Sequence, residues 1–523
     1  MATTLHERET LPPKSPLRVF TPLPSVVAMA CALTACGLQA RTLDSPVVVS
    51  VDTMLTYTTN TAYGSGKNGD ADFLVLVSPA INFEAQSTRL HLEGKVELDS
   101  FSYLQHTQPS RVLPQADIKS NLMLVERLAG VDAALVTRRT TANSFASQGS
   151  DLTSSNIYTT TQARISPYIE HEFTPFVSMA ARSEVSKTHF EAVGNGVIER
   201  PNATSITNTV ELVRKPAPVG AGLQYTHDSS GYDNKPRSNL TRDAARGNVS
   251  YALSDQWVLG AIGGGEKIQT DFSHRSDGFG GGLLRWRPTE RTDLNALAEH
   301  HFYGPTWDVS LTHRTPTFAA LVRLQRIVES SANSIGELSS GSSLSALLDA
   351  MLTTRYPDAV QRAQVVNDAI AGRGLTDSAD SVQDYYSLSV DMQQTATVRF
   401  AMMGKRNTIS VGYTLFKTSP ERWAQDPLVS ILEQPNHQHA FDIQYNHQLT
   451  GSTSFDAIAR WSRTTTPGLD RYSVEKSLTA AFNLKLSPKT AATLGGRRQL
   501  LDSNVVEKGV NESAVFVGLS HRF

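Results

Sequence analysis

From about residue 47 onward, apolar and polar residues alternate along the chain with a period of two. Successive side chains of a β-strand point to opposite faces, so this period predicts strands with one apolar face and one polar face. Residues 90–99 show the pattern clearly. Their apolar face carries Leu90, Leu92, Val96 and Leu98. Their polar face carries His91, Glu93, Lys95, Glu97 and Asp99.

Residues 472–486 predict a second strand of the same kind. Its apolar face carries Val474, Leu478, Ala480, Phe482, Leu484 and Leu486. Its polar face includes Ser473, Glu475, Ser477, Thr479, Asn483 and Lys485. Two architectures use such strands. In a soluble sandwich the apolar face packs on another sheet, whereas in an outer-membrane barrel it faces lipid and the polar face lines a wet lumen.

Strand length and loop asymmetry favour the barrel. Many strands span about ten residues or more, which is enough to cross the hydrocarbon at a tilt. The connections also differ in length, as in barrels with short periplasmic turns and long extracellular loops. Tight turns are expected at 254–256, 287–290, 449–452 and 487–490, and long loops at 58–72, 141–156, 227–239 and 270–282. We therefore expect an all-β fold, a large antiparallel transmembrane β-barrel of about 16–22 strands.

The alternation stops between about residues 328 and 380, where a helical insert is expected. Residues 342–355 and 358–374 read as helices because their apolar positions recur at helical spacing. Strand directions counted back from Phe523 place the insert on the extracellular side if residues 315–327 form an upward strand, and on the periplasmic side if they form a loop. In the first case it would approach from the extracellular mouth or fold into the lumen as a plug. The apolar positions are Leu344, Leu347, Leu348, Met351 and Leu352 in the first helix, and Val360, Ala363, Val366 and Ile370 in the second.

The N-terminus reads as a secretory signal peptide over residues 1–40. Basic residues precede a short apolar run that ends in small residues, and cleavage after Ala40 is expected. The alternative is a lipobox at Leu33–Cys36, which would leave Cys36 lipidated at a new N-terminus. Cys31 and Cys36 are the only cysteines, so residues 41–523, assigned to the barrel, contain no disulfide and no thiolate metal site.

Composition and motifs give no sign of enzyme chemistry. The formal charge of −2 argues against nucleic acid as a partner. The stretch 260–267 superficially resembles a phosphate-binding loop, but Ile268 stands where the motif needs Ser or Thr, so we expect glycines that allow close backbone approach. His437 and His439 stand two apart and so share a strand face. They could bind a metal as a pair, or they could simply be polar residues of the lumen or of the membrane interface. We expect no catalytic, cofactor or metal site.

Two sets of residues carry the functional expectations. His91, Glu93, Lys95, Glu97, Asp99, Glu475 and Lys485 are expected to line the lumen, where opposite charges pair to stiffen the wall and also set the selectivity of a conduit. The chain ends with apolar residues at alternate positions and a final aromatic ring, which resembles the C-terminal signal read by the barrel-assembly machinery. That signal would comprise Val515, Val517, Leu519 and Phe523, although His521 departs from its apolar pattern.

Several segments together resemble the outer-membrane β-barrel proteins associated with exosortase/PEP-CTERM and exopolysaccharide systems. They are 51–63, 70–108 with its Ser78-Pro79, the insert at 355–375, and 402–422 with Arg406-Asn407-Thr408. The resemblance implies a bacterial outer-membrane barrel, a channel or scaffold for export or assembly of an extracellular polysaccharide. Its partners would be outer-membrane lipid, the barrel-assembly machinery, polysaccharide and its export proteins. The alternatives are a general diffusion porin and a structural or adhesive surface barrel without a transport role.

Overall fold

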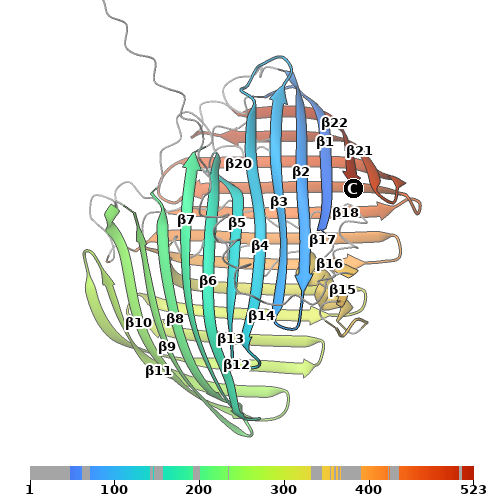
Figure 1. Ribbon diagram of the computed structural model, residues 1–523. Helices are drawn as coiled ribbons and strands as arrows, with labels where there is room; N and C mark the ends of the chain where they lie inside the picture. The colour runs from blue at the N-terminus through green and yellow to red at the C-terminus, as the bar shows by residue number, and fades with distance from the viewer. Residues whose placement is uncertain are drawn as a thin grey trace, which may run out of the picture. The chain divides into compact units, whose positions relative to one another are not determined.

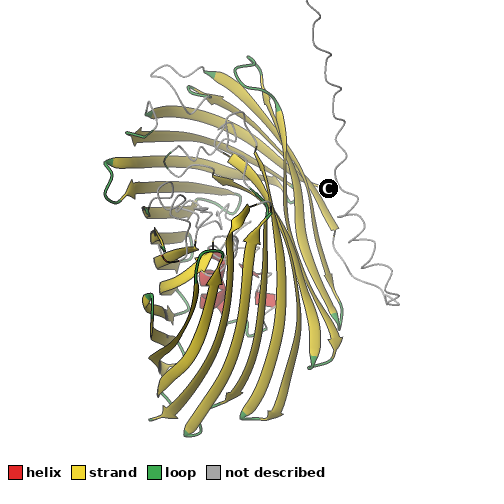
Figure 2. Ribbon diagram, turned by 90° about the vertical axis from the view of Figure 1, so that its left-hand side faces the viewer, coloured by secondary structure: helices red, strands yellow, loops and turns green. Residues whose placement is uncertain are grey.

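A computed structural model shows one closed β-barrel in which every strand is antiparallel to its neighbours (Figures 1 and 2). The structure describes residues 47–61, 71–141, 145, 157–192, 201–233, 235–330, 344–353, 355–358, 361–362, 365–366, 390–421, 423, 435–505 and 509–523. The sheet has 22 strands, at the upper end of the expected range. Each strand pairs with the next in sequence, and the first pairs with the last to close the barrel.

The first half of the wall comprises β1 (Val47–Thr58), β2 (Asp72–Gln86), β3 (Leu90–Tyr103), β4 (Arg111–Val125), β5 (Ala129–Thr141), β6 (Ile157–Thr174), β7 (Val177–Ala192), β8 (Ala203–Arg214), β9 (Val219–Tyr232), β10 (Lys235–Ala252) and β11 (Trp257–Thr270). The second half comprises β12 (His274–Thr289), β13 (Thr292–His301), β14 (Gly304–Arg314), β15 (Phe318–Ser330), β16 (Val390–Met403), β17 (Asn407–Pro420), β18 (Asn436–Gln448), β19 (Thr453–Thr466), β20 (Arg471–Ser487), β21 (Thr490–Ser503) and β22 (Val510–Arg522).

Connections at one end of the barrel are all tight, and the longest connections lie at the other end. The β2–β3, β6–β7, β10–β11 and β20–β21 links are short, whereas 59–71, 142–156, 331–389 and 421–435 separate strands at the opposite end. By the usual asymmetry of outer-membrane barrels, the tight end is periplasmic and the long end extracellular. The β1 start and the β22 end therefore both lie at the periplasmic side.

Two of the expected long loops are mostly strand. Within 227–239, β9 continues through Tyr232 and β10 begins at Lys235. Within 270–282, β12 already begins at His274. These strand ends carry polar residues on both faces, so they lack the alternation that reveals a strand in lipid. Hydrogen bonding between neighbouring strands maintains the sheet there without an apolar face.

The outer face of the barrel is apolar and exposed. Along β22 the side chains of Val515, Val517 and Leu519 are 60%, 49% and 48% exposed. Similar exposed side chains recur around the wall, among them Val49, Leu55, Ile81, Leu98, Val112, Leu223, Val249, Leu478 and Leu494. Trp257 and Trp286 pair across β11 and β12 beside periplasmic turns, with ring centroids 5.4 Å apart. A surface this apolar is suited to lipid rather than water.

The glycine-rich stretch in β11 is strand, as expected. A Cβ at Gly264 would collide with the carbonyl oxygen of Ala245 and the ring of Phe279. Only glycine therefore lets the Phe279 ring lie flat across β11 on the lumen face.

The insert begins later than expected, because β15 continues through Ser330, and β16 starts at Val390. Its described helix, α3 (Leu344–Leu352), buries all five predicted apolar positions. Most of the second expected helix lies outside the described residues, although Val366 joins the same cluster. No helix in the described ranges is long and apolar enough to cross a membrane.

Helix α3 packs against the lumen face of β15 and β16. Its cluster includes Ala319 and Ala401, whereas Phe400 and Met402 on the other face of β16 are exposed. Ala319 follows the tight turn at 315–317 and Ala401 precedes the one at 404–406. The insert therefore leaves the extracellular ends of its two strands and places α3 inside the barrel near the periplasmic end (Figure 2). Of the two expected arrangements, the structure has the one inside the lumen.

Candidate functional site

The polar row expected on the lumen face lies along β3 as predicted, on the face opposite Leu98. His91 and Glu93 approach to 3.7 Å, and Lys95 pairs with Glu97 at 2.5 Å. The first pair is about half exposed on each side, so salt and water screen it strongly. These four side chains form a wet, mixed-charge surface near the periplasmic end of the lumen.

Asp99 is the member of that row that organises its surroundings. It is buried and accepts hydrogen bonds from Ser78 Oγ at 2.5 Å and Gln115 Nε2 at 2.6 Å. The guanidinium of Arg139 reaches it at 2.5 Å. One carboxylate thus connects β2, β3, β4 and β5. Charge-assisted bonds of this kind are stronger than neutral ones and hold a fixed geometry.

The two predicted lumen residues on β20 lie at opposite ends of the strand. Glu475 accepts a hydrogen bond from Gln499 of β21 toward the extracellular end. Lys485 is exposed near the periplasmic end. The structure does not bring either of them near the β3 row, so the seven predicted residues form separate parts of the wall rather than one site.

A buried charged network on β10, β11 and β13 was not predicted. Its core is His301, whose Nδ1 lies 2.7 Å from Glu266 Oε1 and whose Nε2 lies 3.4 Å from Glu299 Oε2. Arg242 pairs with Glu266 at 3.0 Å and Arg246 with Glu299 at 2.6 Å. The side chains of His301, Glu266 and Glu299 are at most 2% exposed. Mutual pairing is what allows such charges to be buried.

Aromatic rings stack against this network. Phe279, His301 and Tyr303 stack with centroids 4.6 and 4.9 Å apart, and Trp423 continues the stack at 6.3 Å from Tyr303. Arg242 Nη2 donates to the Tyr303 hydroxyl at 3.4 Å, and burial raises the pKa of that hydroxyl. The stack runs from the wall into the β13–β14 connection and fixes the network near the extracellular end.

The spacing of these residues along their strands could have indicated part of this network. Arg242 and Arg246 stand four apart, and Glu299 and His301 two apart, so each pair shares a strand face. What spacing cannot show is the bridge from Arg246 on β10 to Glu299 on β13, because two strands lie between them. Gly264 is the register partner of Arg246 and Gly281 that of Glu299, and a Cβ at either glycine would collide with neighbouring backbone.

Further ion pairs line the rest of the wall. Arg399 and Asp442 pair at 3.2 Å between β16 and β18, and Arg497 pairs with Glu512 at 2.6 Å between β21 and β22. Thr58 of β1 donates to the same Glu512 at 2.8 Å. The seam between the first and last strands is therefore closed by a buried carboxylate as well as by the backbone ladder.

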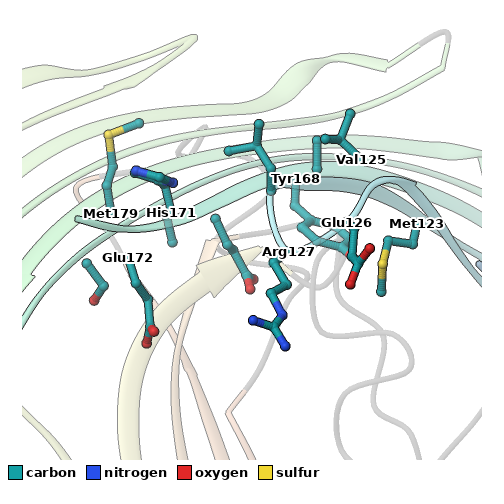
Figure 3. Close-up of a pocket in the computed structure, with 13 residues that line it drawn as sticks. Met123, Val125, Glu126, Arg127, Tyr168, His171, Glu172 and Met179 are labelled. Carbon is teal, nitrogen blue, oxygen red and sulfur yellow. The ribbon is translucent and has the colours of Figure 1, made fainter. Parts of the chain in front are cut away.

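A cavity of about 900 Å³ lies beside the tight turns that join β4 to β5 and β6 to β7 (Figure 3). Its lining includes Glu126, Glu170, Glu172 and Arg127. Figure 3 shows the Glu126 and Glu172 carboxylates and the Arg127 guanidinium pointing the same way, below Tyr168. The lining thus holds three carboxylates and one guanidinium, and Lys215 lies 3.9 Å from the Glu172 carboxylate.

The histidine pair and the N-terminal segment singled out in the sequence do not contribute to a binding site in the described structure. His437 and His439 lie on the outer face of β18, outside the lumen. Within the described ranges, no three His, Cys, Asp or Glu residues are grouped to hold a metal. The expected signal peptide at 1–40 and Cys36 lie outside the described residues.

The C-terminal residues take part in closing the barrel. The backbone N–H of Phe523 donates to the Val49 carbonyl at 2.9 Å, and β22 pairs with both β21 and β1. Val515, Val517 and Leu519 project outward, and Phe523 is 67% exposed. The pattern that predicts an assembly signal is therefore also the outward face of the closing strand. Its recognition by the assembly machinery stays a prediction.

A closed antiparallel barrel with an apolar outside and an ion-paired polar inside defines a class. Only closure satisfies every backbone group of a sheet in lipid, and the combination of faces is that of outer-membrane β-barrels in Gram-negative bacteria. The chain is therefore an outer-membrane β-barrel protein, located in the bacterial outer membrane.

No protein-family model matches the chain, and no curated protein matches it. Similar solved structures include the siderophore receptor PirA from Acinetobacter baumannii, at 8% identity and a TM-score of 0.45, over 92% of this chain and 81% of that one. The outer membrane protein opdK from Pseudomonas aeruginosa has 8% identity and a TM-score of 0.32, over 91% and 98%. A loop-deletion mutant of OmpT, an outer membrane protein of Vibrio cholerae, has 10% identity and a TM-score of 0.31, over 92% and 99%. The class assignment rests on the strand pairing and faces of this chain.

Proposed function

We propose that the protein is an outer-membrane channel whose lumen is gated by the 331–389 insert. The observation that carries this proposal is α3 packed inside a polar, charge-lined barrel, on Ala319 and Ala401 near the periplasmic end. A purely structural barrel needs no polar lumen with an apolar helix held in it. The function that we propose is conduction of solutes and not catalysis.

Two features support α3 as a docked element. Its buried face is entirely apolar, and Leu348 is 0% exposed. Polar contacts fix its other side: Arg362 pairs with Asp349 at 2.6 Å, and Arg314 donates to the Ala350 carbonyl at 3.4 Å. Burying such a face stabilises docking by about 1.5–3 kcal/mol per large side chain, so release requires a competing interaction.

The finer proposal concerns the solute, an extracellular polysaccharide on its way out of the cell. It is supported by the family resemblance and by buried amide and hydroxyl side chains on the lumen face of β16 to β18, the face that also carries the Arg399–Asp442 pair. Sugar hydroxyls are recognised by such amide and hydroxyl groups rather than by net charge. The lining groups are Gln393, Thr397, Thr408, Ser410, Asn436, Gln438, Gln444 and Asn446.

A general diffusion porin is the second candidate. It is favoured by the mixed charges of the β3 row, which impose no strong preference of sign. Single-channel current in the presence of neutral oligosaccharides separates the two. A polysaccharide conduit shows long blockades that lengthen with chain length, whereas a general porin shows none.

The gate is tested by one substitution on α3 with a matched control. Leu348→Asp places an unpaired carboxylate in the apolar cluster, which costs several kcal/mol and should release α3. Ala346→Asp adds the same charge on the exposed side of the same helix. In liposome swelling with small neutral sugars, we expect L348D to accelerate permeation and A346D to behave as the wild type. Equal rates for L348D and the wild type would show that α3 does not gate the lumen.

A further inference from the structure

A group of basic side chains lies on the outer face of β17, β18 and β19, which follow one another around the wall (Figure 1). Lys417 is the register partner of His437, and His439 is the partner of Arg463. We call these four residues the outer basic patch. They point outward because their neighbours along each strand are buried on the lumen face. Those neighbours are Phe416, Thr418, Asn436, Gln438, Ala440 and Thr464.

An aromatic row marks the level of the patch in the membrane. Tyr413, Phe441 and Trp461 are register partners on the same outer face. Along their strands they lie two to four residues closer to the periplasmic turns than the patch residues do. Aromatic side chains are enriched where hydrocarbon meets the headgroups. The outer basic patch begins just beyond this row, on the side of the extracellular connection 421–435. It therefore lies at the level of the outer-leaflet headgroups.

The charges of the patch lack the acidic partners that lumen charges have. On β16 the outward partner of Lys417 is the neutral Gln394. Leu415, the β17 partner of His439, has Ala396 as its own partner on β16. The outward acidic residue on β21, Asp502, is two strands beyond Arg463. Among the described residues, no ion pair includes Lys417 or Arg463, whereas Arg399 and Arg497 on lumen faces are paired.

The patch therefore carries two cations, Lys417 and Arg463, that have no acidic partner among the described residues. Lys417 and Arg463 lie on either side of the two histidines, next to His437 and His439 respectively. The Tyr413 hydroxyl lies 3.0 Å from His439 Nδ1 and fixes that ring beside the two cations. An anionic group seated among them would convert mutual repulsion into attraction.

The dimensions fit a phosphate group. Neighbouring strands are about 4.8 Å apart and alternate residues about 7 Å apart, so the four side chains start within roughly 10 by 7 Å. Long basic side chains reach across such a distance to one anion. Lys476 on β20 is exposed and is the register partner of Trp461, so it adds one outward cation at the level of the aromatic row.

We propose that the outer basic patch binds the phosphorylated headgroup of an outer-leaflet lipid. The acyl chains then lie against the apolar outer face below, and the aromatic row contacts the boundary between the two. This proposal is independent of whether the lumen conducts.

The test measures lipid binding to the purified full-length protein by native mass spectrometry. The probes are a bisphosphorylated glucosamine-based lipid and the same lipid without its phosphates. We expect the wild type to retain the phosphorylated lipid and not the other. Arg463→Gln and Lys417→Gln should each lower retention about fivefold, as expected for one basic residue at an anionic lipid surface. Arg463→Lys should restore most of it.

Lys489→Gln is the matched control, since Lys489 lies in a tight turn at the periplasmic end. It should leave retention unchanged. Lys417 and Arg463 lie on the outer face and Lys489 in an exposed turn, and heat-modifiable gel mobility confirms that each variant is folded. Equal retention of the two lipids by the wild type, or equal losses for R463Q and K489Q, would overturn the proposal.

Discussion

At the scale of single residues, the lumen wall is organised by buried carboxylates that each join several strands. Asp99 accepts hydrogen bonds from β2 and β4 and pairs with Arg139 of β5. Glu512 does the same across the seam between β22 and β1. The His91–Glu93 and Lys95–Glu97 pairs of the β3 row lie within one strand and connect no others. The sequence therefore predicts the face on which these residues lie. It does not predict which of them joins several strands, because that depends on partners from strands distant in the sequence.

Asp99→Ala tests this distinction. Removing the carboxylate leaves the Arg139 guanidinium buried without its partner, which costs about 3–5 kcal/mol. Glu93→Ala on the same strand face removes only an exposed charge and should cost no more than about 0.5 kcal/mol. Urea unfolding of the barrel in lipid vesicles measures both changes. Similar losses for the two variants would mean that Asp99 is no more than another polar lining residue.

At the scale of elements, strands within the lipid were predictable and strands outside it were not. Lipid on one side and water on the other impose alternation, so the sequence predicts the strands at 90–99 and 472–486. Beyond the lipid both faces of a strand are polar, so the ends of β9, β10 and β12 show no alternation and the sequence predicts loops there. The helix α3 was recognised by its apolar spacing. Its position near the periplasmic end was not, since spacing says nothing about where a helix docks.

The last strand supports a prediction about assembly. Phe523 is the final residue of a strand that closes the barrel, and it projects an exposed ring outward. Deleting Phe523 should reduce outer-membrane insertion and leave protein in the periplasm, because the terminal aromatic residue of the expected signal is lost. Cell fractionation with heat-modifiable gel mobility measures the inserted fraction. Ser520→Ala, which alters the lumen-facing side of the same strand, is the control. Normal insertion of the truncated chain would refute the assembly signal.

At the scale of the whole molecule, three features have separate physical origins. Closure follows from the need to satisfy every backbone group in lipid. The ion-paired lumen follows from the polar half of the alternation. The helix inside the barrel follows from an insert between two adjacent strands whose ends, Ser330 and Val390, remain register partners. The first two were predictable from the chain, whereas the buried Arg242–Glu266–His301–Glu299–Arg246 network needed the folded arrangement of four strands.

That register also allows the insert to be removed cleanly. Because Ser330 and Val390 pair directly, residues 331–389 can be replaced by Asn-Gly, a two-residue turn that suits antiparallel hairpins. The excised protein keeps all 22 strands and the complete lumen wall. Any difference from the wild type then reports on the insert alone.

Single-channel conductance in planar bilayers, compared between the wild type and this excised protein, tests the central claim most directly. A gated channel predicts small or intermittent currents for the wild type and a steady conductance about tenfold higher or more after excision, since lumen radius limits ion flow. Equal conductance would contradict gating by the insert, and the absence of conductance in both would contradict the channel itself.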